Sequence, residues 1–109
     1  MNNSRIIFFG TPEFAMRVLK ALLENQYHVV AAVSQPDRPM GRRHIVEPTP
    51  VHALCNEHHI PCIQPEKLSE AKEQIRKLAP DVILTCAYGQ FLSTSILELP
   101  TIGCTNLHP

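Results

Sequence analysis

Short apolar runs alternate along this chain with stretches in which apolar residues recur every three or four positions. The runs are apolar on both faces, which is typical of parallel strands that are covered by helices on each side of a sheet. We expect these runs to form the strands Ile6–Phe9, Val29–Val33, Val82–Ala87 and Gly103–Leu107. Because strands and helices alternate, the pattern predicts a doubly wound α/β fold, with a mostly parallel sheet and helices on both of its faces.

Helix starts are marked by residues that commonly cap helices. Thr11-Pro12 and Thr49-Pro50 each combine a capping hydroxyl with a proline suited to the first helical turn. Ser69 is expected to cap a third helix, and a short fourth helix over Ser93–Leu99 ends at Pro100. These helices fall between the predicted strands, as the crossover connections of a parallel sheet require.

Two segments and the end of the sequence depart from this alternation. Ser34–Pro48 is rich in proline and arginine and predicts an exposed loop. Ile60–Ile63 predicts a brief strand in which Pro61 favours the edge of the sheet. The sequence stops at Pro109, directly after the last predicted strand. We therefore expect the α/β domain to be incomplete at its C-terminus and to be part of a longer enzyme.

Charge and hydropathy limit the partners of the chain. Its 109 residues include ten Lys or Arg and ten Asp or Glu, so there is no overall basic field, and any site for a polyanion has to be a local patch. The apolar runs are too short to cross a bilayer, and the first strand leaves no room for a secretory signal. The four cysteines form no Cys-x-x-Cys pair, which favours reduced thiols. We expect a soluble cytoplasmic domain without membrane contact.

Two candidate cofactor motifs are incomplete. A dinucleotide site after the first strand needs several glycines, but Gly10 is followed by Pro12, which lacks an N–H, and by Glu13, which repels phosphate. The segment Cys55-x-x-His58-His59-x-x-Cys62 contains zinc-binding side chains. However, adjacent histidines on a helix point about 100° apart. We expect a tight turn at the first motif, core thiols and solvated histidines at the second, and no metal.

Asn106 and His108 are the strongest chemical pair in the sequence. Residues two apart on a strand share one face, and the ligands of doubly wound sheets bind beyond the carboxyl ends of the strands. At that place an imidazole can move a proton, and a carboxamide can donate a hydrogen bond to a developing oxyanion. Spacing alone leaves a second interpretation open, in which both side chains only satisfy backbone groups at a strand end.

Four blocks of the chain are similar, in the same order, to the methionyl-tRNA formyltransferase family, and the similarity covers essentially the whole sequence. The blocks are Ile6–Phe14 (IIFFGTPEF), Gln35–Arg42 (QPDRPMGR), Ala87–Leu92 (AYGQFL) and Gly103–Pro109 (GCTNLHP). The Asn-x-His element is shared by the wider group of formyltetrahydrofolate-dependent transferases, whereas the arginine-containing block is typical of the branch that acts on tRNA. The resemblance implies formyl transfer from 10-formyltetrahydrofolate to the amino group of initiator methionyl-tRNA, in translation initiation.

The resemblance also implies a domain organisation. Residues 1–109 would be the N-terminal part of a Rossmann-like formyltransferase domain. The family's catalytic Asp and its C-terminal tRNA-binding barrel would lie beyond Pro109. An intact enzyme of this family is expected to act as a monomer.

The same resemblance implies roles for individual residues. Asn106 would donate to the oxyanion that forms when the amine attacks the formyl carbon, and His108 would assist charge stabilisation and proton transfer. The residues that match the family's pterin-binding loop are Tyr88, Gly89, Gln90, Phe91 and Leu92. A loop over residues 36–44 would enter the acceptor end of the tRNA, and its cations are Arg38, Arg42 and Arg43.

Other interpretations of these features stay open. Phe91 and Leu92 are alternatively core residues where a loop meets a helix. The whole chain is alternatively a folate-dependent formyltransferase for a small-molecule amine, although such a substrate needs no arginine clamp for phosphate. A non-catalytic nucleotide-binding α/β module is a further alternative, which the missing glycine fingerprint disfavours.

Overall fold

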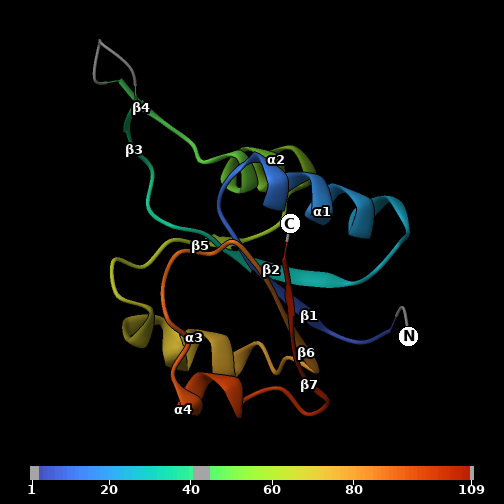
Figure 1. The fold of residues 1–109 in the computed structure, drawn as a ribbon. Helices are drawn as coiled ribbons and strands as arrows, with labels where there is room; N and C mark the ends of the chain where they lie inside the picture. Colours follow the sequence, from blue (N-terminus) through green and yellow to red (C-terminus); the bar gives the residue numbers. More distant parts are fainter. Residues whose placement is uncertain (1–2, 41–44, 109) are drawn as a thin grey trace.

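The computed structural model describes residues 3–40 and 45–108 of the chain (Figure 1). Its elements follow in the order β1 (Ile6–Gly10), α1 (Glu13–Glu24), β2 (Val29–Val33), β3 (Arg38–Met40), β4 (Ile45–Glu47), α2 (Pro50–His58), β5 (Cys62–Ile63), the 3-10 helix η1 (Leu68–Ala71), α3 (Lys72–Lys77), β6 (Val82–Cys86), α4 (Thr94–Leu97) and β7 (Gly103–Leu107). Within these described ranges, no helix combines the length and the hydropathy that a membrane span requires.

Five strands form one sheet in the order β5-β2-β1-β6-β7, and every neighbouring pair is parallel. From β1 the chain moves outward through β2 to β5 and then returns to place β6 on the other side of β1. The strand order therefore reverses between β1 and β6, and doubly wound sheets bind ligands beyond the carboxyl ends of the strands at such a point. The predicted Rossmann-like parallel sheet is confirmed, and so is the edge position of the strand that follows Pro61.

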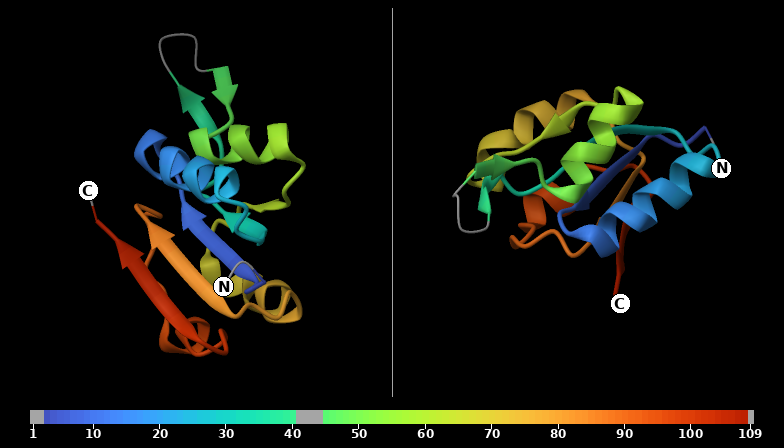
Figure 2. Two further views of the ribbon diagram at one scale, coloured as in Figure 1. Left: turned by 90° about the vertical axis from the view of Figure 1, so that its right-hand side faces the viewer. Right: turned by 90° about the horizontal axis from the view of Figure 1, so that it is seen from above.

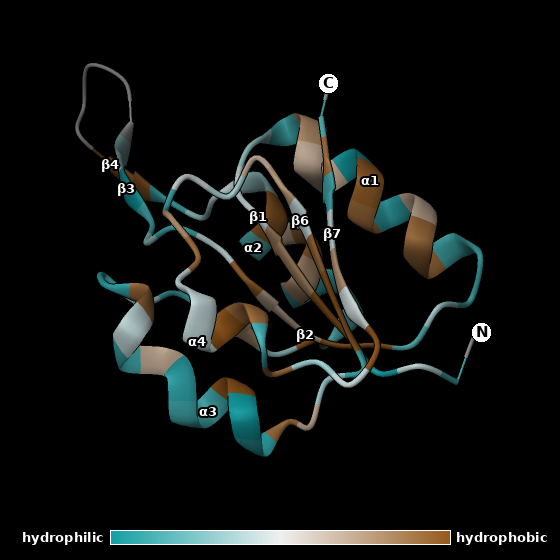
Figure 3. Ribbon diagram, turned by 60° about the horizontal axis from the view of Figure 1, so that its bottom comes forward, coloured by the Kyte–Doolittle hydropathy of each residue, from teal (hydrophilic) through white to brown (hydrophobic). Residues whose placement is uncertain are grey.

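Helices α1 and α2 cover one face of the sheet, whereas α3 and α4 cover the other (Figures 1 and 2). The two-sided apolar run of β1 explains this layering, because alternate residues of a strand point to opposite faces. Ile7 and Phe9 pack with Ile75 of α3, and Phe8 packs with Leu19 of α1. Each such side chain contributes about 1.5–3 kcal/mol when it is fully buried. Figure 3 shows the result as hydrophobic central strands flanked by helices with hydrophilic outer stretches.

The carboxyl end of β1 lies so close to α1 that only glycine fits there. A Cβ on Gly10 would lie 2.7 Å from Ala15 Cβ and 2.8 Å from the Cys86 carbonyl oxygen. Both distances are shorter than van der Waals contact, so a side chain would push α1 away from the sheet. The glycine of the first βα turn thus serves the packing of the first helix.

Thr11 does not cap α1, and the sequence-based expectation is wrong at this position. The helix begins at Glu13, and Pro12 before it supplies no side-chain cap. The Thr11 hydroxyl instead donates to the Tyr88 carbonyl oxygen at 2.7 Å and accepts from the Gln35 N–H at 3.1 Å. Parallel strands bring their carboxyl ends together, so these long-range partners replace the local cap.

The other two predicted caps differ in outcome. Thr49 precedes α2 and its side chain accepts from the His52 N–H at 3.2 Å, which confirms the prediction. Ser69 lies inside η1, where Lys67 occupies the capping position, so the prediction for Ser69 is wrong. The chain turns into a 3-10 helix before α3 begins, and the sequence pattern did not indicate this extra turn.

The segment predicted as an exposed loop contains an antiparallel hairpin. In it β3 pairs with β4, with Arg38 opposite Glu47 and Pro39 opposite Val46. A two-stranded ribbon leaves one edge of each strand unpaired, and a proline without an N–H is tolerated at such an edge. The hairpin projects away from the five-stranded sheet (Figures 1 and 2). Because this segment is rich in proline, its sequence pattern predicted a loop and did not indicate the two strands.

Candidate active site

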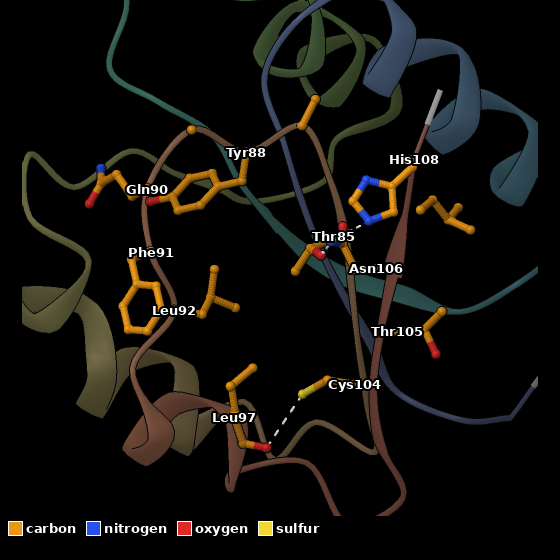
Figure 4. Close-up of a pocket in the computed structure, with 13 residues that line it drawn as sticks. Thr85, Tyr88, Gln90, Phe91, Leu92, Leu97, Cys104, Thr105, Asn106 and His108 are labelled. Carbon is orange, nitrogen blue, oxygen red and sulfur yellow. Dashed lines mark hydrogen bonds between the residues drawn. The ribbon is translucent and has the colours of Figure 1, made fainter.

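A cavity of about 450 Å³ opens at the carboxyl ends of β6 and β7 (Figure 4). Its walls come from the loop after β6, from α4, and from β7 with the residue that follows it. The sequence-predicted residues that line it are Tyr88, Gly89, Gln90, Phe91, Leu92, Asn106 and His108. The fold thus brings the predicted catalytic pair and the predicted pterin-binding loop into one cavity.

Three polar side chains form a row of hydrogen bonds along one wall (Figure 4). Thr85 of β6 is directly opposite Asn106 of β7 in the sheet, and Thr85 Oγ1 donates to Asn106 Oδ1 at 2.8 Å. Asn106 Nδ2 lies 3.2 Å from His108 Nε2. The alternation of side chains along β7 therefore places Asn106 and His108 on the same face, as their spacing predicted.

These bonds fix the direction of the Asn106 carboxamide and the tautomer of His108. Because the Thr85 hydroxyl occupies the carboxamide oxygen, Asn106 Nδ2 faces the imidazole. An amide nitrogen only donates, so His108 Nε2 is the acceptor and the neutral ring carries its proton on Nδ1. Asn106 and His108 are both exposed. The second N–H of Asn106 Nδ2 is therefore available to a ligand in the cavity.

Two residues of the loop after β6 adopt a left-handed backbone conformation. Ala87 has φ 53° and Gly89 has φ 104°. A Cβ on Gly89 would lie 2.7 Å from Gln35 Nε2. Glycine is therefore favoured at position 89 both by the backbone conformation and by the approach of the Gln35 side chain.

Gln90 holds this loop in place with its side-chain amide. Its Oε1 accepts from the Leu68 N–H at 3.0 Å, and its Nε2 donates to Gln35 Oε1 at 2.8 Å and to the Pro65 carbonyl oxygen at 3.3 Å. Both ends of the amide are thus engaged within the protein. A ligand in the cavity can therefore form hydrogen bonds with the backbone of Gln90 rather than with its side chain.

Tyr88 is buried beneath the loop. Its ring packs edge-on against Phe9, with 5.2 Å between the ring centroids, and its carbonyl oxygen accepts from the Thr11 hydroxyl. Burial raises the pKa of Tyr88 to about 12, so the phenol stays protonated at neutral pH. Among the residues that the structure describes, none hydrogen-bonds to this buried hydroxyl.

The opposite wall of the cavity is apolar and open. Phe91 is 88% exposed, and Leu97 of α4 is 41% exposed. Leu92 is half-buried and packs against the core. The alternative in which both loop residues belong to the core therefore fits Leu92 and not Phe91. An exposed aromatic ring beside a cavity is a suitable wall for a planar ligand.

Thr85, Leu97 and Cys104 line the cavity but were not singled out from the sequence. Cys104 Sγ donates to the Leu97 carbonyl oxygen at 3.4 Å and so connects β7 to α4 (Figure 4). A threonine within an otherwise apolar strand was the available signal for Thr85. Its partner depends on strand register, which the sequence pattern does not specify.

Arg38, which the resemblance predicts to contact tRNA, does not line this cavity. Arg38 lies on β3, and its Nη2 is 3.3 Å from Glu66 Oε2 in a pair whose side chains are both exposed. Such an exposed pair contributes about 1 kcal/mol or less, so Arg38 is free to exchange partners. Arg42 and Arg43 lie outside the described residues.

The two cysteines of the incomplete zinc motif, Cys55 and Cys62, lie in side-chain contact with each other. Cys55 is buried against α1 and the sheet, whereas His58 and His59 are exposed at the end of α2. Within residues 3–40 and 45–108, no three His, Cys, Asp or Glu side chains are grouped so that they could hold a metal ion.

The sequence of this chain is similar to the sequences of known proteins. A family model described as formyl transferase matches residues 4–109. Methionyl-tRNA formyltransferase of Thermotoga sp. (strain RQ2) is 49% identical over 107 residues, which cover 96% of this chain and 34% of the relative. The enzyme of the same name from Geobacter sulfurreducens is 50% identical over 110 residues, which cover 99% of this chain and 35% of the relative. The chain thus spans 34–35% of the length of these relatives.

Proposed function

This chain belongs to the formyl transferase family, and on that premise we propose that the protein transfers a formyl group from 10-formyltetrahydrofolate to the amino group of initiator methionyl-tRNA. The observation that carries the proposal is the 3.2 Å hydrogen bond between Asn106 Nδ2 and His108 Nε2, on the wall of the cavity that the loop after β6 also lines. Residues 1–109 correspond in this proposal to the N-terminal part of the formyltransferase domain. The proposal includes a monomeric enzyme that acts in the cytoplasm, where aminoacyl-tRNAs are used.

The reaction exchanges one carbon–nitrogen bond for another. The amine of methionyl-tRNA attacks the formyl carbon, and the bond from that carbon to N10 of the folate then breaks. The proton lost by the amine ends on N10, so tetrahydrofolate leaves as a neutral amine. Between the two steps the formyl oxygen carries negative charge as a tetrahedral oxyanion.

The geometry supplies a group for each requirement of this path. The free N–H of Asn106 Nδ2 donates to the oxyanion, and a donor of this kind typically lowers the barrier by about 3 kcal/mol. His108 Nε2 accepts the hydrogen bond from Asn106, so this bond has to open before the exposed imidazole takes up the proton that the amine releases. Thr85 acts through Asn106 as a positioning residue.

The formyl donor is proposed to lie between the loop after β6 and α4. Phe91 and Leu97 offer apolar surface to the pterin ring, and the backbone of residues 88–92 offers hydrogen-bonding groups to its edge. Gly89 and Gln90 contribute through the loop conformation that they hold. No part of this proposal uses a metal ion.

The tRNA is proposed to contact the β3–β4 hairpin. Arg38 is exposed on β3, and guanidinium groups bind phosphate through two parallel hydrogen bonds. Arg42 and Arg43, outside the described residues, belong to the same proposal from the sequence resemblance. Because the net charge of these 109 residues is zero, attraction of tRNA by this part of the protein has to come from such a local group of cations.

A direct assay tests this function. The whole protein is incubated with 10-formyltetrahydrofolate and methionyl-tRNA, and formyl-methionine is quantified after deacylation of the tRNA. Parallel reactions contain free methionine or an amino sugar as the amine. Formylation of methionyl-tRNA alone supports the proposal, whereas formylation of a small amine and not of the tRNA would contradict it.

A further inference from the structure

The β3–β4 hairpin projects from the five-stranded sheet, so packing against the core does little to set its direction (Figures 1 and 2). The exposed side chains of its strands are Arg38, Pro39, Ile45, Val46 and Glu47. A two-stranded ribbon without a buried face gains little stability of its own. The direction of the hairpin therefore depends on its base, where residues 34–37 lead into β3 and residues 48–49 follow β4.

Asp37, the last residue before β3, joins the two sides of this base. Its Oδ1 accepts from the Thr49 N–H at 2.9 Å, so the carboxylate connects the segment that enters the hairpin to the segment that leaves it. The hydroxyls of Ser34 and Thr49 lie 2.6 Å apart and form a second bond between the same two segments. The two ends of the hairpin are therefore held together independently of the pairing between its strands.

Asp37 also connects the base to two elements of the body. Gln64, directly after β5, donates from Nε2 to Asp37 Oδ1 at 2.7 Å and to the Gln35 carbonyl oxygen at 3.1 Å. His52 Nδ1 of α2 lies 2.8 Å from Asp37 Oδ2. Because an ionised carboxylate only accepts hydrogen bonds, the imidazole carries a proton on Nδ1. Both oxygens of Asp37 are thus engaged by donors from separate parts of the fold.

These donors approach one carboxylate from different directions and so define its position. The side chains of His52 and Asp37 are only 22% and 21% exposed, which limits the competition from water for their bond. Since Asp37 is followed directly by Arg38, a fixed Asp37 also fixes the first residue of β3. The pair of Arg38 with Glu66 is exposed and contributes less. A fixed carboxylate therefore holds the start of the hairpin at a set angle to the body.

We propose that Asp37 is a positioning residue for the acceptor, which fixes the direction of the β3–β4 hairpin through its three hydrogen-bond partners so that the hairpin is already oriented when tRNA binds. This inference rests on the proposed function, because it takes the hairpin to contact methionyl-tRNA. Asp37 itself touches no substrate. A hairpin that is held in advance loses less conformational entropy on binding, and such preorganisation increases affinity.

The kinetics of Asp37→Ala in the whole protein test this role. We expect the KM for methionyl-tRNA to rise by about tenfold, which corresponds to a hairpin that has the competent direction about one tenth of the time. The kcat at saturating tRNA and the KM for the formyl donor should not change, because the bound tRNA then orients the hairpin.

The sign of the effect separates positioning from charge. Removal of a negative charge alone would strengthen the binding of a polyanion and lower the KM for methionyl-tRNA, so a rise identifies lost positioning. Glu57→Ala is the matched control, since Glu57 is an exposed carboxylate on α2, the helix that also carries His52. This control should not raise the KM for methionyl-tRNA.

Two variants of His52 guard against poor folding of Asp37→Ala. His52→Ala removes one donor to Asp37 and should raise the same KM by a smaller factor, because Thr49 and Gln64 still bind the carboxylate. His52→Asn supplies an amide N–H in place of the imidazole N–H and should restore the original KM. His58→Ala, at the exposed end of α2, is the control. Equal KM values for His52→Ala and His52→Asn would contradict a role for this hydrogen bond.

An NMR measurement without tRNA tests the positioning directly. In the unaltered protein, the residual dipolar couplings of the Arg38, Val46 and Glu47 amides should fit the same alignment tensor as those of the five-stranded sheet. In Asp37→Ala the hairpin couplings should fall toward zero while those of the sheet persist. Hairpin couplings that are already averaged in the unaltered protein, or that stay unchanged in the variant, would overturn the inference.

The outcomes separate this inference from the function on which it rests. An unchanged or lower KM for methionyl-tRNA in Asp37→Ala would overturn the positioning role. An equal rise in the KM for the formyl donor would do the same, since the effect would then not be specific to the hairpin. No transfer to methionyl-tRNA by the unaltered protein would instead refute the proposed function, and the dipolar couplings would still decide whether Asp37 holds the hairpin.

Discussion

Thr85 Oγ1 donates to Asn106 Oδ1 at 2.8 Å across the pairing of β6 with β7. This bond occupies the carbonyl end of the carboxamide and so turns Nδ2 toward His108 and the cavity. A free carboxamide could present either end to a ligand, and only the nitrogen can donate to an oxyanion. The direction of the donor in the candidate site is thus set by a neighbouring strand.

Thr85→Val keeps the shape of the side chain and removes the hydroxyl. This change should lower kcat by about tenfold, because the loss of a group that orients a catalytic side chain typically has an effect of this size. The KM for both substrates should stay within a factor of two of the original, because Thr85 acts through Asn106. Steady-state kinetics checks this expectation, and Thr85→Ser should restore most of the rate. A variant with normal kcat would show that Asn106 needs no such orientation.

Tyr88→Phe should stabilise the ligand-free protein by about 1 kcal/mol, because a buried hydroxyl without a partner costs free energy that the phenyl ring avoids. The free energy of unfolding from urea titration measures the effect. Tyr27→Phe is the control, since Tyr27 is only half-buried. Destabilisation by Tyr88→Phe would reveal a hydrogen bond to this hydroxyl.

Phe91→Ser should raise the KM for 10-formyltetrahydrofolate several-fold and leave stability within about 0.5 kcal/mol, as for other exposed positions. The reason is that Phe91 is 88% exposed and contributes surface to the cavity rather than to the core. Ile102→Ser is the matched control, since Ile102 is 71% exposed and does not line the cavity. A similar rise in KM for both variants would remove Phe91 from the folate site.

Asp37 should make the stability of the fold depend on acid pH. Burial alone would raise the pKa of Asp37, but hydrogen bonds from the Thr49 N–H, Gln64 and His52 outweigh it and hold the pKa below the ordinary value of 3.8. The ionised carboxylate therefore stabilises the fold above that pH, and the contribution is lost as the pH falls through the lower folded-state pKa.

Asp37→Asn should accordingly be less stable than the original protein at neutral pH, and the difference should shrink below about pH 4. Urea midpoints measured at several pH values give the comparison. Glu24→Gln, at the exposed end of α1, controls for the loss of one negative charge. A stability difference that is the same at every pH would mean that the charge of Asp37 has no part in it.

The strands and the shared face of Asn106 and His108 could be predicted from the sequence, because both depend on local periodicity. Strand register could not, so the partner of Asn106, Thr85, was missed. The same limit explains Thr11, whose position before Pro12 indicates a cap. Its hydroxyl is instead used by residues far away in the sequence that the parallel sheet brings to the same edge.

The hairpin and the hydrogen bonds at its base were also beyond sequence reasoning. Pro36 and Pro39 are typical of a loop, and the pairing of β3 with β4 is a property of the folded chain. Asp37 has no local partner, and its bonds to Thr49 and His52 join segments that the sequence pattern treats separately. The tRNA-contacting role of Arg38 stays a prediction from the resemblance.

The most direct test of the central claim is the single-turnover rate of formyl transfer to methionyl-tRNA by Asn106→Ala in the whole protein. Loss of one oxyanion donor should reduce this rate by about 100-fold or more, while the affinity for methionyl-tRNA and the free energy of unfolding stay near their original values. A rate within threefold of the original would contradict the account, because Asn106 would then make no contact with the reacting formyl oxygen.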